Sequence, residues 1–143
     1  MTRFALTRLL PGVLLLGIAC RPDHASVAVH PISNAIAYTA KSKLHICDSS
    51  ANGCAQSDLG FKPVASVYVE GSLVFASGGE IYRCDDRGQA CTTVKLTFSN
   101  PASMGVGSSG QIVVVSTHGV VNLCSAASCK VPTPAGAGSP APR

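Results

Sequence analysis

The stretch Gly79-Glu80-Ile81-Tyr82-Arg83-Cys84-Asp85-Asp86-Arg87-Gly88-Gln89-Ala90-Cys91 decides the fold of this chain. It contains a short apolar-polar run that ends at Cys84, a polar loop with Gly88 in it, and a second cysteine that opens the run to Leu96. Two short runs of strand-forming residues around a turn-forming loop are typical of a β-hairpin. Facing residues of paired strands lie at disulfide distance, so we expect Cys84 and Cys91 to be bridged.

Two further cysteine pairs repeat this pattern along the chain. Cys47 and Cys54 lie 37 residues before Cys84 and Cys91, respectively. Cys124 and Cys129 form the third pair, and Cys124 lies 40 residues after Cys84. Each pair is preceded by two more short apolar segments with polar or Gly-rich turns between them. Short strands at regular spacing predict an all-β domain over residues 26–130, made of three four-stranded antiparallel repeats at 26–62, 66–98 and 103–130.

Four antiparallel strands in about 40 residues is the size of one β-propeller blade, and propellers typically have four to eight blades. Three repeats therefore leave the closure of the domain open. Two chains can join in a six-bladed ring, with Val27, Val29, Val113 and Val115 near the interface. The other two solutions are an open arc capped by a partner, which protects its sheet edges, and a closed monomeric β-trefoil of three similar units.

The loop in the second repeat resembles the Asp-box of sialidase-type propellers, whose pattern is Ser-x-Asp-x-Gly-x-Thr-Trp. Asp86 and Gly88 match its Asp and Gly, while Cys84 and Cys91 stand at its Ser and Trp. The resemblance implies a hairpin between the third and fourth strands of a blade. It also implies that Asp86 accepts backbone N–H groups in the turn and that Gly88 takes a positive φ.

The other repeats depart from this pattern, and the sequence does not match the active site of the family. Ser49 stands at the Asp position of the first repeat, and the third loop is two residues shorter. The resemblance implies an active site in which a cluster of Arg side chains binds a carboxylate. Residues 26–130 contain only two arginines, Arg83 and Arg87. The resemblance therefore implies fold and not activity.

The N-terminal segment has the features of an export signal. Arg3 and Arg8 precede an apolar run of ten residues from Leu9 to Ile18, which is too short for a bilayer span of about 20 residues but fits a signal peptide. Gly17 and Ala19 place small residues three and one positions before Cys20. This arrangement resembles the lipobox of bacterial lipoproteins, although Gly17 stands where that family usually has Leu. The resemblance implies a signal peptide at 1–19 and a lipid on Cys20 that tethers the protein to the membrane.

Cysteine arithmetic supports the same interpretation. The chain has seven cysteines, and setting Cys20 aside leaves six. In an oxidising compartment close pairs are expected to be disulfides. A zinc site is the competing interpretation, but the spacing within each pair is wider than the usual two to four residues. We predict the bridges Cys47–Cys54, Cys84–Cys91 and Cys124–Cys129, a short tether at 20–25, and a Pro/Ala/Gly tail without fixed structure at 131–143.

Charge gives no sign of nucleic-acid binding. Without Arg3 and Arg8, nine of the eleven basic residues remain against seven acidic ones, and they are scattered. The basic stripe that nucleic-acid binding needs is absent from the sequence. We therefore expect partners of other kinds: the membrane, through the lipid on Cys20, and a protein or glycan ligand.

Candidate catalytic groups are few. Glycoside hydrolysis needs two carboxylates, for which Glu70, Glu80, Asp85 and Asp86 are available, but all four lie in or beside predicted turns. The histidines have no metal-type spacing and are expected at the surface; they are His24, His30, His45 and His118. We predict no catalytic, cofactor or metal residues and no cofactor.

The expected function is non-enzymatic. We expect a membrane-tethered binding or scaffolding module of the bacterial cell envelope, at the outer membrane or the periplasmic face. The alternatives are an enzyme that acts on glycans and a truncated fragment of a longer propeller.

Overall fold

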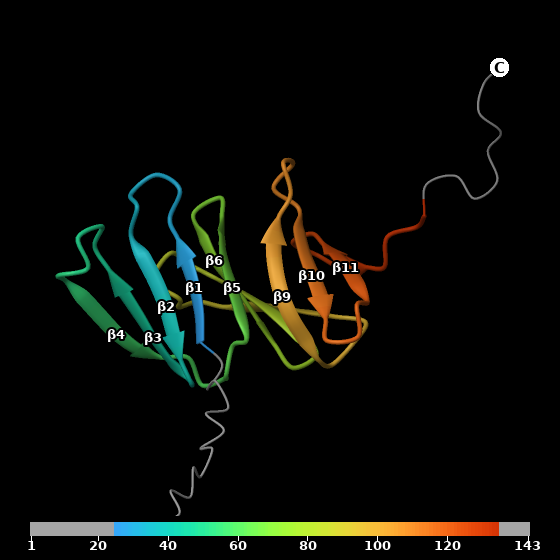
Figure 1. Cartoon of the computed structure of the whole chain (residues 1–143), viewed down its shortest axis with the longest axis horizontal. Coiled ribbons are helices and arrows are strands. Elements are labelled where there is room, and N and C mark those ends of the chain that lie inside the picture. The colour runs from blue at the N-terminus through green and yellow to red at the C-terminus, as the bar shows by residue number, and fades with distance from the viewer. Residues whose placement is uncertain (1–24, 135–143) are drawn as a thin grey trace, which may run out of the picture.

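The computed structural model describes residues 25–134, which form β-strands joined by turns and loops. Within this range three antiparallel sheets each contain four strands that follow one another in the sequence (Figure 1). We call these sheets blades 1, 2 and 3. The predicted signal peptide, Cys20 with most of its predicted tether, and the predicted tail from residue 135 onward lie outside the described residues.

The strand bounds follow the three repeats. Blade 1 consists of β1 (Ala25–Val29), β2 (Ile36–Ala40), β3 (Lys43–Cys47) and β4 (Cys54–Asp58). Blade 2 consists of β5 (Ala65–Val69), β6 (Ser72–Ser77), β7 (Glu80–Cys84) and β8 (Thr92–Lys95). Blade 3 consists of β9 (Pro101–Val106), β10 (Ile112–Ser116), β11 (Val121–Cys124) and β12 (Cys129–Lys130).

The predicted fold class is confirmed, and the trefoil alternative is wrong. A trefoil needs strands of neighbouring repeats to pair into one closed barrel. In residues 25–134 the strands pair only within their own repeat, in the order first to fourth strand. The blades instead lie next to one another in chain order, with β5 between β1 and β9 (Figure 1).

The core consists of two layers between the blades. Ala28, Ala37 and Leu44 of blade 1 pack against a second set from blade 2, which consists of Tyr68, Leu73, Phe75 and Cys84. The opposite face of blade 2 packs against blade 3 through Val69, Val74, Ala76, Ile81, Ile112, Val114 and Cys124. Successive strand residues point to opposite faces of a sheet, so β5, β6 and β7 of blade 2 each contribute to both layers.

This arrangement explains the different burial patterns of equivalent strands. In β6 the four residues from Leu73 to Ala76 are all buried, because blade 2 is covered on both faces. In β2 and β10 burial alternates along the strand, because blades 1 and 3 are each covered on one face only.

Three disulfides close the hairpins between the third and fourth strands. They are Cys47–Cys54, Cys84–Cys91 and Cys124–Cys129, the predicted pairs. In blades 1 and 3 the bridged cysteines face each other directly in the strand register. Disulfides of this kind persist in oxidising compartments. No helix within residues 25–134 is long and apolar enough to cross a membrane.

Candidate functional site

The β7–β8 hairpin is built around Asp85. Its Oδ1 accepts the backbone N–H of Arg87 at 3.0 Å and that of Gln89 at 2.7 Å. Gly88 takes a positive φ of 74°, as its match to the Asp-box implied. The role expected of Asp86 is wrong, because the acceptor lies one residue earlier. An Asx-type turn bonds the N–H two residues on, and only Asp85 has that offset to Arg87.

The other two hairpins use the same position. Asp48 Oδ1 accepts the N–H groups of Ser50 and Asn52, both at 3.0 Å. Ser125 Oγ accepts those of Ala127 and Ser128, both at 3.3 Å. A residue with a short oxygen-bearing side chain directly after the first cysteine is thus the shared signal of the repeats, and this signal is visible in the sequence.

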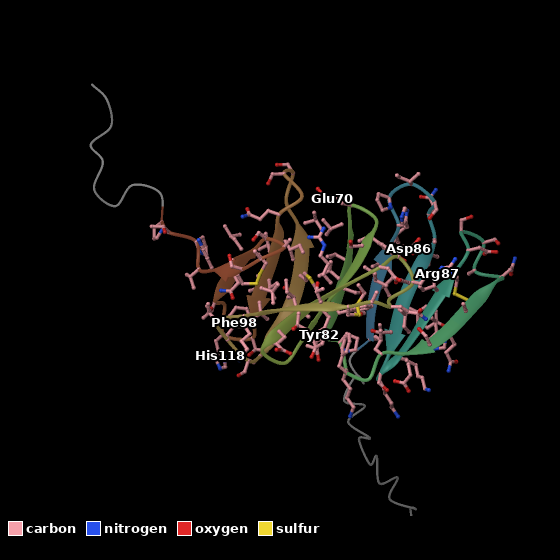
Figure 2. All side chains as sticks on the ribbon, turned by 180° about the vertical axis from the view of Figure 1, so that it is seen from behind. Glu70, Tyr82, Asp86, Arg87, Phe98 and His118 are labelled. Carbon is pink, nitrogen blue, oxygen red and sulfur yellow. A yellow bond between two sulfur atoms is a disulfide. The ribbon has the colours of Figure 1, made fainter. Side chains whose placement is uncertain are left out.

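The β7–β8 hairpin leaves its own blade and lies on blade 1. Gly88 is buried, and a Cβ at this position would collide with the Leu44 Cδ2 atom and contact Leu59. Asp86 and Arg87, next to Gly88, therefore lie over the strands of blade 1 (Figure 2). Glycine is needed here both for the positive φ and for the close approach.

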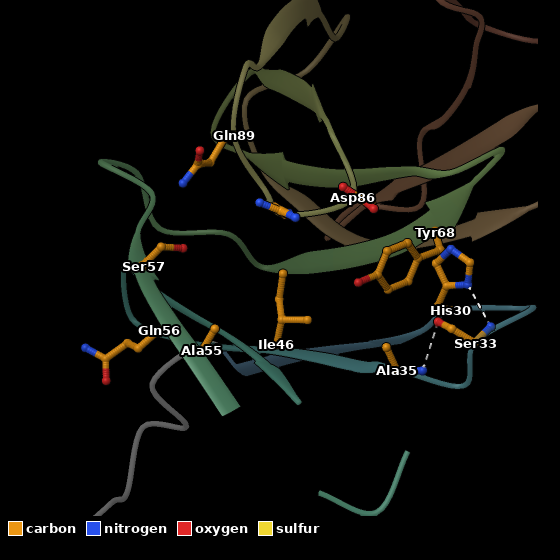
Figure 3. Close-up of a pocket in the computed structure, with 11 residues that line it drawn as sticks. His30, Ser33, Ala35, Ile46, Ala55, Gln56, Ser57, Tyr68, Asp86 and Gln89 are labelled. Carbon is orange, nitrogen blue, oxygen red and sulfur yellow. Dashed lines mark hydrogen bonds between the residues drawn. The ribbon is translucent and has the colours of Figure 1, made fainter. Parts of the chain in front are cut away.

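A pocket of about 610 Å³ lies between this hairpin and blade 1 (Figure 3). Ala35, Ile46 and Ala55 of blade 1 form an apolar floor. The polar groups around it are His30, Ser33, Gln56, Ser57, Tyr68, Asp86, Arg87 and Gln89. The volume and the mixture of apolar floor and few polar groups are those of small-ligand sites.

Tyr68 and His30 form one wall of the pocket. Their rings lie edge to face with centroids 5.0 Å apart. His30 Nδ1 accepts the backbone N–H of Ile32 at 3.2 Å and that of Ser33 at 3.1 Å, which orients the ring and assigns its proton to Nε2. Burial, and then the nearby carboxylate of Asp86, raise the pKa of Tyr68 above its ordinary value, so its hydroxyl stays a hydrogen-bond donor at neutral pH.

Two charged side chains, Asp86 and Arg87, line the pocket. Among the residues that the structure describes, no hydrogen bond or ion pair engages the Asp86 carboxylate or the Arg87 guanidinium. The same holds for the side-chain amides of Gln56 and Gln89. The pocket thus offers one anion-binding group, one carboxylate acceptor and several neutral donors and acceptors.

The comparisons with known proteins establish the fold. No protein-family model matches the chain, and no curated protein sequence does. The crystal structure of BamB from Moraxella catarrhalis matches it with a TM-score of 0.56 at 12% sequence identity. The blades of this chain are propeller-like. The match covers 71% of this chain and 34% of that one, so the chain spans about a third of its neighbour's length.

The finer resemblance to the sialidase Asp-box gains no support from these comparisons. No family match includes the box, and the turn acceptor is Asp85 instead of Asp86. What the propeller-like blades share with that family is the hairpin between third and fourth strands.

The other carboxylates do not converge on the pocket. Glu70 Oε2 lies 3.5 Å from Arg83 Nη2, Glu80 Oε2 accepts the Tyr82 hydroxyl at 3.0 Å, and Asp85 is engaged in its turn. Asp86 is thus the one carboxylate among the pocket's described lining residues. The lining residues therefore do not provide the pair of carboxylates that glycoside hydrolysis needs.

The remaining histidines lie elsewhere. His45 stacks on Tyr38 with ring centroids 4.6 Å apart. The His118 Nδ1 atom lies 2.6 Å from Asn100 Nδ2, in the β10–β11 turn. His24 is outside the described residues. Within residues 25–134 no group of three or more His, Cys, Asp or Glu side chains could hold a metal ion.

Sequence reasoning did not find this site. His30 and Tyr68 are 38 positions apart and belong to different repeats, and the sequence places Arg87 only in a hairpin loop. The signal that the sequence contains is limited to two adjacent charged residues, Asp86 and Arg87, directly before Gly88 in a hairpin loop.

Proposed function

We propose that this chain is a non-catalytic binding module of the bacterial cell envelope, tethered to the membrane by a lipid on Cys20. Its ligand is a protein or glycan whose polar group enters the pocket between blades 1 and 2. Three disulfides support an exported location. The pocket, with its unengaged Asp86 and Arg87, is the observation that carries the proposal.

The lining groups favour a ligand with both an acidic and a hydrogen-bond-donating group. Arg87 suits a carboxylate, and Asp86 accepts an amine or hydroxyl hydrogen. Gln56 and Gln89 pair with amides, and the apolar floor at Ile46 accommodates a methyl group or a sugar face. A peptide-bearing envelope sugar combines these groups in one molecule.

The test is isothermal calorimetry of the full chain in mild detergent. The probes are a synthetic muropeptide, its disaccharide without peptide, and its peptide without sugar. We expect the muropeptide to bind, and expect Arg87→Ala and Asp86→Asn each to weaken binding about tenfold, the loss of one charge-assisted hydrogen bond.

The control variant is Lys95→Ala, which removes an exposed cation of blade 2 that does not line the pocket. It should leave the affinity unchanged. Failure of all three probes to bind, or equal affinities in the Arg87→Ala and Lys95→Ala proteins, would contradict the proposed function.

A further inference from the structure

Blades 1 and 3 each have one face that nothing in the described structure covers. On blade 1 this face contains Val27 and Val29, which are 63% and 55% exposed, together with the outward residues Ile36, Tyr38 and His45. On blade 3 the uncovered face contains Val113, Val115, Val121 and Leu123. Because the two blades stand at opposite ends of the row, these faces point away from each other (Figure 1).

The internal repeat shows what such faces bind. We define the forward face of a blade as the one that packs on the next blade in the chain. In blade 1 it includes Ala37 and Ile46, which pair in the register, and in blade 2 it includes the equivalent pair Val74 and Arg83. The equivalent pair in blade 3 is Val113 and Leu123. The uncovered face of blade 3 is therefore a forward face.

The uncovered face of blade 1 is of the opposite type. We define the backward face as the one that packs on the preceding blade. In blade 2 it includes the pair Phe75 and Tyr82, and in blade 3 the pair Val114 and Asn122. The equivalent pair in blade 1 is Tyr38 and His45. The chain thus leaves open one forward and one backward face, the two halves of an interface that it already makes twice.

We propose that two copies of this chain associate head to tail, with the forward face of each blade 3 on the backward face of the other copy's blade 1. Two such contacts give six blades, which lies within the range of four to eight found in closed propellers. Contacts between unlike faces close into a ring where the rotation permits it. The apolar residues of both faces are then buried as their equivalents are within one chain.

A hollow on blade 3 is consistent with this partner. Gln111, Leu123 and Lys130 line a depression of about 360 Å³ on its forward face. By register and repeat these positions correspond to Ala35, Ile46 and Ala55, the floor of the pocket between blades 1 and 2. In the ring, the β3–β4 hairpin of the second copy would cover this hollow as the β7–β8 hairpin covers blade 1.

Sedimentation of the full chain in a density-matched detergent tests the proposal. We expect a dimer that dissociates on dilution. Val29→Asp on blade 1 and Val115→Asp on blade 3 should each weaken the dimer by a factor of about 30 or more, because each places a charge in an apolar interface. The control is Ile32→Asp, at an 86% exposed turn position on neither face, which should leave the dimer intact.

Mixing the two variants shows whether the contact is head to tail. A mixed pair has one interface of two unchanged faces, so the mixture should dimerise at concentrations at which each variant alone is monomeric. This recovery also shows that both variants are folded. Val27→Asp and Val113→Asp provide a second pair should either variant fail to fold.

Three results would overturn the proposal. One is a full chain that is monomeric at all concentrations, and a second is an open polymer whose mass grows without limit. The third concerns Val131, Pro132 and Thr133, which also line the hollow on blade 3. A chain that dimerises only after deletion of residues 131–143 would assign the face to its own C-terminal segment.

Discussion

Gly88 serves two purposes, the turn of its own hairpin and the contact between two blades. Its φ of 74° is in the left-handed region, where a side chain costs about 1 kcal/mol. Its Cα also faces the fully buried side chain of Leu44, so a methyl group would force that side chain to move. Overpacking of a core costs a further 1–3 kcal/mol, roughly.

We therefore expect Gly88→Ala to lower the free energy of unfolding by about 2–4 kcal/mol. The matched control is Gly119→Ala, at a φ of 80° with no atom within 4 Å of the added Cβ, which should cost only about 1 kcal/mol. Urea unfolding followed by circular dichroism measures both. Equal losses in the two variants would show that the hairpin does not press on Leu44.

Tyr68 and Asp86 offer a test of the pocket through their titration. Burial and then the Asp86 carboxylate raise the pKa of Tyr68 above 10.0. The neutral hydroxyl therefore contributes stability that is complete below pH 10 and declines as the pH rises through the folded-state pKa.

In an ultraviolet titration of tyrosinate, we expect Tyr68→Phe to remove a component that titrates above the ordinary tyrosine range. Asp86→Asn should move that component to lower pH, because it removes the nearby negative charge but leaves the burial unchanged. A titration curve that Asp86→Asn does not alter would contradict the placement of the two groups in one pocket.

At the scale of elements, the hairpins between third and fourth strands are the units that repeat most faithfully. Each combines a disulfide with an oxygen acceptor directly after the first cysteine. In the entropy model each short loop adds about 2–2.5 kcal/mol of stability. The turn acceptor orients the residues at the hairpin tip, among them Arg87.

Two adjacent residues, Asp85 in the turn and Asp86 in the pocket, allow the two features to be tested separately. Asp85→Ala removes the acceptor of two backbone N–H groups, and we expect it to lower the free energy of unfolding by about 1–2 kcal/mol. Asp86→Ala should change it by less than about 0.5 kcal/mol, as is usual for exposed residues without partners. Thermal unfolding of the two variants gives the comparison, and the reverse order would restore the Asp-box assignment of Asp86.

At the scale of the whole molecule, we propose that the location of the protein depends on Cys20, which lies outside the described residues. We expect Cys20→Ala to move the protein from the membrane to the soluble fraction, because the mutation removes the attachment point of the lipid. Fractionation of cells and the mass of the intact protein provide the measurement. A variant that stays in the membrane fraction, beside a native protein that lacks acyl chains, would rule out the anchor.

The local pattern of the sequence was enough to predict the strands, the hairpins and the disulfides. Alternation of apolar residues, turn chemistry and cysteine spacing act over a few residues, so Cys84 and Cys91 can be paired without knowledge of the rest of the chain. The positive φ of Gly88 was implied by the resemblance to the Asp-box. The assignment of the turn acceptor to Asp86 was wrong because a family pattern was used where the local offset to Arg87 decided the geometry.

Only the tertiary structure decided how the blades meet and what lies between them. Tyr68 and Asp86 join His30 in one pocket because the second hairpin reaches over blade 1, a contact that depends on the fit of Gly88 to Leu44. The choice between trefoil and blades likewise depended on which repeats share hydrogen bonds. Such contacts are the sum of many weak packing interactions between residues far apart in the chain, and no local pattern in the sequence contains them.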